Sequence, residues 1–174
     1  NYCQVYAKSL AMPLWTGAVC MSRKVFDEMG GFPKGIKLGE DFLLWIRIAL
    51  KYKVVLINRP LSFYNQDVDA VNRGVGKLHN PEEHMLWNVD FLAEEEKTNP
   101  DYKQLIDNLR TYGLLPYYLS KEYHEAAQQE LKKVDWSRQH AKTRKQYSKP
   151  LSVLRLEFAL RRIASNCKRH LIGH

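Results

Sequence analysis

The strongest constraint on the fold is a change in the character of the chain near residue 77. Before it, short apolar segments are separated by Gly and Pro, whereas after it the segments are longer and helical in composition. Three of these later segments begin near a proline: Pro81, Pro100 and Pro150. Proline is tolerated in the first turn of a helix. The pattern predicts an α/β segment over residues 1–77, followed by a mainly α-helical extension over residues 78–174.

The apolar stretches of the first part predict buried strands. Residues 15–22 and 54–58 are uncharged and rich in small or β-branched side chains, and residues 61–64 can form a short third strand. A short helix is expected over residues 23–29, between Ser22 as its N-cap and Gly30-Gly31 as its end. Further helices are expected over residues 5–12, 40–50, 81–97, 100–112, 114–133 and 150–171.

Charge is concentrated at the C-terminal end. The 174 residues carry a formal net charge of +8, and residues 138–174 hold ten Lys or Arg against one acid, so the first 137 residues are nearly neutral. Such asymmetry indicates either an anionic partner or a solvated helix face. No apolar run approaches the roughly 20 residues of a membrane-spanning helix. Three scattered cysteines predict neither disulfides nor zinc, which favours a cytoplasmic location, and the six histidines predict no metal site.

Two carboxylates stand where a helix is expected to begin. Glu40 and Asp41 directly follow a Gly-containing loop. A helix N-terminus favours an ionised carboxylate, and such a group can act as a general base. The alternative is an ordinary pair of acids in a first helical turn.

Three strings resemble one family of enzymes. They are Trp15-Thr-Gly-Ala-Val-Cys-Met-Ser-Arg-Lys-Val-Phe-Asp-Glu-Met-Gly-Gly-Phe-Pro33, Leu38-Gly-Glu-Asp-Phe-Leu-Leu-Trp-Ile-Arg47 and Asn58-Arg-Pro-Leu-Ser-Phe-Tyr-Asn65. In order and spacing they resemble the second half of the family-two glycosyltransferases, over about residues 10–73. The resemblance implies part of a GT-A sheet, the nucleotide-diphospho-sugar-binding fold. It also implies that Asp41 accepts the proton of an acceptor hydroxyl, with inversion at the sugar, while Glu40 orients or supports.

The resemblance also implies residues that bind substrate. Thr16 and Gly17 occupy the strand end that faces the sugar in the family. Trp45 lies one helical turn after Asp41, where it either walls the acceptor site or packs in the core. Arg73 matches a position near the diphosphate, and its alternative is an exposed loop residue.

The donor-binding half of the family pattern is missing from this sequence. The family holds Mn²⁺ or Mg²⁺ with an Asp-x-Asp motif, but only 14 residues precede Trp15, and Asp67-Val-Asp69 lies on the wrong side of the Glu-Asp helix. The complete enzyme is therefore expected to use a divalent metal whose ligands lie mostly outside this chain. Its expected partners are a nucleotide-sugar donor and a saccharide or lipid-linked acceptor, and the chain alone is expected to be incomplete and inactive.

The last expected helix has a continuous apolar stripe, formed by Val153, Leu156, Leu160, Ile163, Cys167 and Leu171. Arg155, Arg162 and Arg169 follow the opposite side. This pattern is typical of a helix lying on anionic lipid at the inner face of a membrane, and equally of a helix docked on its own domain. The alternative to an enzyme is a non-catalytic accessory module whose basic tail contacts membrane, protein or nucleic acid. The near-neutral first 137 residues argue against nucleic acid.

Overall fold

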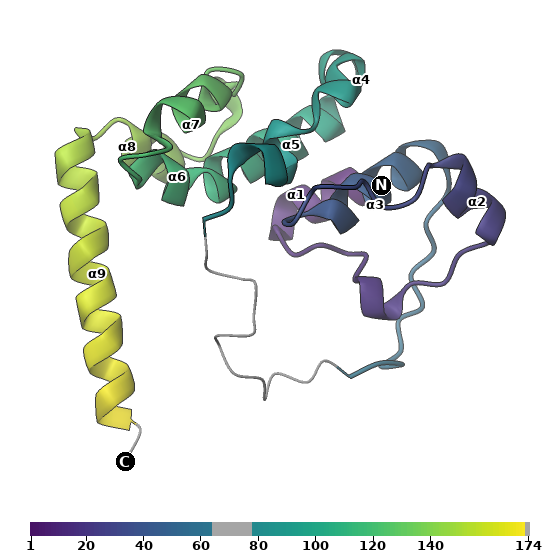
Figure 1. Cartoon of the computed structure of the whole chain (residues 1–174), viewed down its shortest axis with the longest axis horizontal. Coiled ribbons are helices and arrows are strands. Elements are labelled where there is room, and N and C mark those ends of the chain that lie inside the picture. Colours follow the sequence, from purple (N-terminus) through teal and green to yellow (C-terminus); the bar gives the residue numbers. More distant parts are fainter. Residues whose placement is uncertain (64–77, 173–174) are drawn as a thin grey trace.

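The computed structural model describes residues 1–63 and 78–172, with side chains as far as residue 164, and this part of the chain is built from helices (Figure 1). Its β pairing is limited to an isolated parallel bridge between Leu38 and His84. The prediction of an α/β segment with a partial GT-A sheet is therefore wrong. The expectation of a helical second part is confirmed over residues 78–172.

The helices of the described residues follow the sequence pattern in part. They are α1 Tyr2–Ser9, α2 Arg23–Glu28, α3 Glu40–Lys51, α4 Ala93–Thr98, α5 Pro100–Gly113, α6 Leu115–Leu119, α7 His124–Leu131, α8 Ala141–Tyr147 and α9 Leu151–Ile172. The expected helices 23–29, 40–50, 100–112 and 150–171 are confirmed as α2, α3, α5 and α9. The expected helix 5–12 begins and ends earlier, as α1, while 114–133 is divided into α6 and α7. Helix α8 was not predicted.

The two main strand predictions fail because a strand needs a partner. Residues 15–22 contain a 3₁₀ turn, Thr16–Ala18, between extended residues at Trp15 and Val19. Residues 54–58 pair with no other described strand, and Val55 and Leu56 are 83% and 79% exposed. β-branched side chains favour an extended backbone, but a strand is stabilised by hydrogen bonds and packing from its neighbours. Without them, both segments remain irregular.

The expected helix 81–97 is interrupted by side chains that hydrogen-bond to the backbone. The Asn88 amide donates to the carbonyls of Glu82 and His84, at 3.1 and 2.9 Å. His84 Nδ1 accepts from the Leu86 N–H at 3.1 Å. Such local bonds compete with helical ones. Burial lowers the pKa of His84 to about 4, with a smaller contribution from His79, and this keeps the imidazole neutral and able to accept. The outcome is a series of 3₁₀ turns before α4.

The core joins the two parts of the chain on either side of residue 77. Helix α1 packs against α5, and one buried cluster contains residues of α1 and α3 together with residues of 86–134. Polar contacts reinforce the pairing: the Asn108 side chain donates to the Ala7 carbonyl at 3.0 Å, and Asn1 and Gln4 donate to Asp101. The first helix therefore depends on a partner about one hundred residues later.

A buried ionic network holds α4, α5 and α7 together. Arg110 is 1% exposed, and its guanidinium donates two hydrogen bonds to Glu96, at 2.5 and 3.0 Å. Lys103 contacts Glu96 and Asp107 at 3.0 and 2.7 Å, and Glu130 lies 3.7 Å from Arg110 Nε. Burial opposes ionisation of Glu96, but the bonds from Arg110 and Lys103 outweigh it and lower the pKa of that carboxyl. Asp107 also lies 3.6 Å from Arg110, so three acids surround this guanidinium.

Candidate functional site

Thr16 and Asp41, predicted for one site, are in direct contact. The Thr16 hydroxyl donates to Asp41 Oδ2 at 3.2 Å, across 25 residues of sequence. The other carboxylate oxygen, Oδ1, accepts from the Phe42 N–H at 2.8 Å. Asp41 is half-buried and Thr16 is exposed, so the pair lies at the surface. The contact joins the segment Trp15–Ala18 to the N-terminus of α3.

Gly39 sets the direction in which the chain enters α3. Its φ of 84° lies in the left-handed region, and a Cβ there would collide with the Met85 side chain, so only glycine fits. Gly39 provides no side-chain cap, and Glu40 and Asp41 occupy the first turn. Acidic groups in a first turn interact favourably with the helix dipole. Glu40 is half-buried beside Asp41, and among the described residues it pairs with no cation.

Gly17 lies beneath the ring of Trp15. A Cβ at Gly17 would stand 2.7 Å from the Trp15 ring, so a larger residue would displace that side chain. This close packing is a reason for glycine that the sequence did not reveal. The expected approach of a sugar to Gly17 stays a prediction.

Trp45 is a core residue beneath the candidate site. It is 2% exposed, packs edge-on against Phe32 at 5.8 Å between ring centres, and belongs to a second buried cluster with Leu44 and Ile48. Among the described residues, its indole N–H has no hydrogen-bond partner. This placement is that of the core-packing alternative. The indole supports α3 rather than presenting an open face to solvent.

Arg47 connects the Gly-Gly turn to α3, a role that the sequence analysis missed. Its guanidinium donates to the carbonyls of Met29 and Gly31 at 2.8 and 3.2 Å, while Nε donates to the Leu43 carbonyl at 2.9 Å. Gly30 and Gly31 have φ of 76° and 65°. The sequence does contain a basis for predicting this role. A turn after α2 leaves backbone carbonyls without partners, and an arginine on a neighbouring helix can donate hydrogen bonds to them.

Arg73, Asp67 and Asp69 lie outside the described residues. Where the structure is described, no three His, Cys, Asp or Glu side chains are grouped so as to hold a metal ion. The Mn²⁺ or Mg²⁺ implied by the resemblance therefore has no fitting ligand set in this part of the chain. The site is a carboxylate and a hydroxyl at a helix N-terminus, an arrangement that can accept a proton from a bound alcohol.

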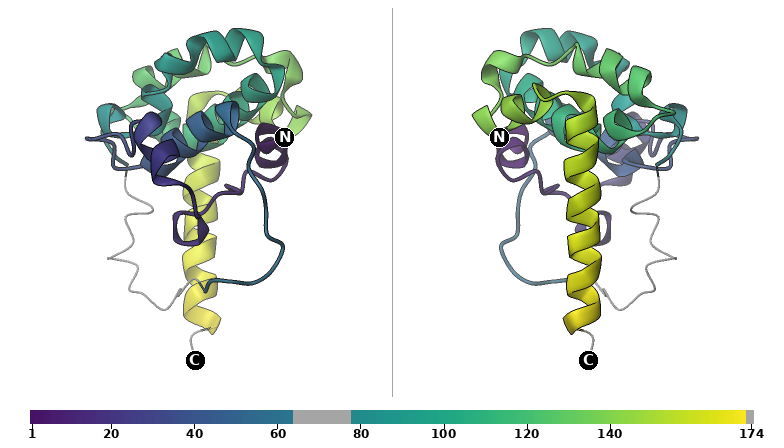
Figure 2. Two further views of the ribbon diagram at one scale, coloured as in Figure 1. Left: turned by 90° about the vertical axis from the view of Figure 1, so that its right-hand side faces the viewer. Right: turned by 90° about the vertical axis from the view of Figure 1, so that its left-hand side faces the viewer.

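Helix α9 forms a second candidate surface and extends away from the other helices (Figure 2). Leu154 is buried, and Arg155 donates to the carbonyls of Leu119 and Ser120, both at 2.9 Å, so this side is docked on α6. The apolar stripe faces elsewhere, and its described members are exposed: Val153, Leu156, Leu160 and Ile163. Across residues 1–63 and 78–172, no helix combines the length and apolar character needed to cross a membrane.

Comparisons with known proteins leave the family of this chain open. Neither the protein-family models nor the curated proteins and solved structures include a significant match. Function is therefore inferred from the sequence and from the geometry of the described residues.

Proposed function

We propose that this chain supplies the acceptor side of an inverting glycosyltransferase that uses a nucleotide-sugar donor, within a longer gene product. The hydrogen bond between Thr16 and Asp41 carries the proposal. It joins two of the strings that resemble the family and leaves a half-buried carboxylate at the surface. The described residues form no sheet, so the fold does not support the proposal, which depends on this contact and on the sequence strings.

In the proposed mechanism, Asp41 accepts the proton of the acceptor hydroxyl as its oxygen attacks the anomeric carbon. The bond from that carbon to the nucleoside diphosphate breaks on the opposite face, and the diphosphate leaves with the electron pair, which inverts the sugar. Thr16 holds Asp41 in one orientation through its hydrogen bond. Glu40 adds negative charge beside it without reacting. The donor is bound by residues outside the described part of the chain.

Thr16→Val tests the positioning role of the hydroxyl. Losing one hydrogen bond to a charged group is expected to lower kcat about tenfold while the acceptor KM is unchanged. The measurement is the initial rate of nucleoside diphosphate release by the complete gene product, with UDP-, GDP- and dTDP-sugars and Mn²⁺ or Mg²⁺. Thr16→Ser keeps the hydroxyl and should retain the native rate. Equal rates for Thr16→Val and the native protein would contradict the assignment. If neither protein released nucleoside diphosphate, the enzyme proposal would be wrong and the accessory module would be favoured.

We also propose that α9 rests on an anionic membrane surface. The exposed stripe lies opposite the docked side of the helix, so lipid can contact it while the domain remains attached. The net positive charge of residues 138–174 provides the attraction to anionic headgroups. Cys167, Leu171 and Arg169 lie where side chains are not described. The location implied is peripheral, at the inner face of the membrane.

Leu156→Ser combined with Leu160→Ser is expected to weaken vesicle binding by at least about tenfold, because two leucine side chains would no longer enter the lipid. Co-sedimentation with phosphatidylserine vesicles measures the effect. Val55→Ser with Leu56→Ser is the matched control, since these residues are exposed and apolar but lie far from α9 in the sequence. Equal losses in both variants, or equal binding to uncharged vesicles, would overturn the proposal.

A further inference from the structure

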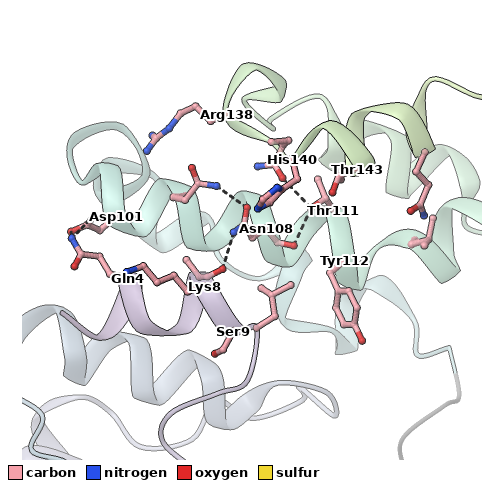
Figure 3. Close-up of a pocket in the computed structure, with 16 residues that line it drawn as sticks. Gln4, Lys8, Ser9, Asp101, Asn108, Thr111, Tyr112, Arg138, His140 and Thr143 are labelled. Atoms are coloured by element: carbon pink, nitrogen blue, oxygen red, sulfur yellow. Dashed lines mark hydrogen bonds between the residues drawn. The ribbon is translucent and has the colours of Figure 1, made fainter.

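A polar groove lies between α1, α5 and α8, and none of its lining residues belongs to the Asp41 site (Figure 3). Its volume is about 580 Å³, within the range of small-molecule binding sites. Four of the seven glutamines of the chain line it: Gln4, Gln104, Gln139 and Gln146. Each amide carries a donor and an acceptor side by side, which is the pattern that neighbouring hydroxyl groups match.

Gln139 is the buried polar group of this groove. It is 6% exposed, and its Oε1 accepts from the Thr111 hydroxyl at 3.4 Å, while Nε2 has no partner among the described residues. Turning the amide over would pair the nitrogen with Thr111 and leave the oxygen unpaired instead. In either orientation one polar atom of a buried amide needs a further partner. A buried polar group in this state is stabilised by a ligand or a water molecule.

The neighbouring amides are held in place before any ligand arrives. Gln104 donates to Asn108 at 2.7 Å, and Asn108 donates to the Ala7 carbonyl at 3.0 Å. Figure 3 shows Asn108 and Thr111 along α5. The first of these hydrogen bonds stays within α5, and the second joins α5 to α1. A preorganised wall reduces the entropy lost on binding.

Tyr112 gives the groove an aromatic face. Tyr112 is 70% exposed, although it directly follows the buried Thr111 on α5. Figure 3 places Tyr112 and Thr143 toward one end of the groove, and Gln4 and Asp101 toward the other. Asp101 is already occupied by Asn1 and Gln4. The Tyr112 end therefore offers an exposed ring beside hydroxyl and amide groups.

We propose that this groove binds a neutral saccharide of about disaccharide size. The amide of Gln139 would turn toward the groove and hydrogen-bond a ring hydroxyl, and Tyr112 would stack against the apolar face of a sugar ring. Lys8, Arg138 and His140 also line the groove, so a phosphate ion is the competing ligand. The proposal stands independently of Asp41 and of any transfer reaction.

The test is a titration of the 174-residue chain, followed by NMR signals of the Gln139 amide and the Tyr112 ring. The probes are cellobiose, lactose, maltose and di-N-acetylchitobiose, each taken to millimolar concentration, with inorganic phosphate in a separate series. Saturable shifts of both groups with at least one disaccharide are expected. Shifts with phosphate alone would identify an anion site and overturn the proposal, as would no shift with any disaccharide.

Two variants locate the binding. Gln139→Met keeps the size of the side chain and removes the unpaired atom, so it should weaken disaccharide binding about tenfold without lowering the melting temperature. Gln128→Met, an exposed glutamine on α7, is its matched control and should bind as the native chain does. Tyr112→Ala should also weaken binding, and Tyr112→Phe should restore it. Native affinity in both Gln139→Met and Tyr112→Ala would contradict the proposed location.

Discussion

We expect Asp41→Asn to lower the rate of sugar transfer by a factor of about 10² to 10⁴, which is the contribution of a positioned general base. The amide oxygen of Asn can still accept from the Phe42 N–H, and its nitrogen can donate to the Thr16 hydroxyl, so the local geometry is retained. The loss is therefore one of proton acceptance rather than of folding. The measurement is initial nucleoside diphosphate release by the complete gene product, beside a thermal melt.

Glu40→Gln is the matched control for this prediction, because the two carboxylates are adjacent in the first turn of α3. It should reduce the rate less than about tenfold, since Glu40 is assigned a supporting electrostatic role. A larger loss in Glu40→Gln than in Asp41→Asn would exchange the roles of the two residues. Native activity in Asp41→Asn would exclude it as the base.

The second large effect is expected for stability in Arg110→Ala. Removing a buried cation leaves the carboxylates of Glu96, Asp107 and Glu130 close together without it, and breaking a buried pair costs about 3–5 kcal/mol. Small domains have a free energy of unfolding of about 5–15 kcal/mol, so this is a large share. Urea unfolding of the native chain and the variant at neutral pH measures the difference.

Arg23→Ala is the matched control, because Arg23 also pairs with an acid on its own helix, Asp27 at 2.8 Å, but in solvent. Its expected cost is below about 1 kcal/mol. Similar unfolding energies for the two arginine variants would show that the network contributes little.

The same network makes stability depend on pH. The pKa of Glu96 is lowered in the folded state, so the contribution of this carboxylate to the free energy of unfolding is present above the ordinary glutamate pKa and is lost as the pH falls.

The sequence predicted the features that depend on neighbouring residues. The start of α3 at Glu40, the Ser22 cap and the Gly30-Gly31 end of α2 follow from local backbone preferences. Strand pairing is not local, so the predicted strands 15–22 and 54–58 would need partners that the described residues do not provide. Arg110 and Gln139 were missed for a related reason: their burial arises only when α5 meets α4, α7 and the segment before α8.

The candidate site was predicted in part. The family strings placed Thr16 and Asp41 in one site, and the two are in contact. Trp45 could be assigned to either of two roles from its helical spacing, and its 2% exposure is that of a core residue. Arg47 was overlooked because its partners are backbone carbonyls, which carry no signature in a list of residue types.

The pairing of α1 with α5 has a consequence for the order of folding during synthesis. Tyr6 and Cys3 of α1 are 6% and 2% exposed in the folded chain, but their α5 partners are translated about one hundred residues later. At about 5–20 residues per second, α1 waits several seconds outside the ribosome with this apolar surface uncovered. A protein cut near residue 77 would keep α1 in that state permanently, because each piece would hold only one side of the shared core.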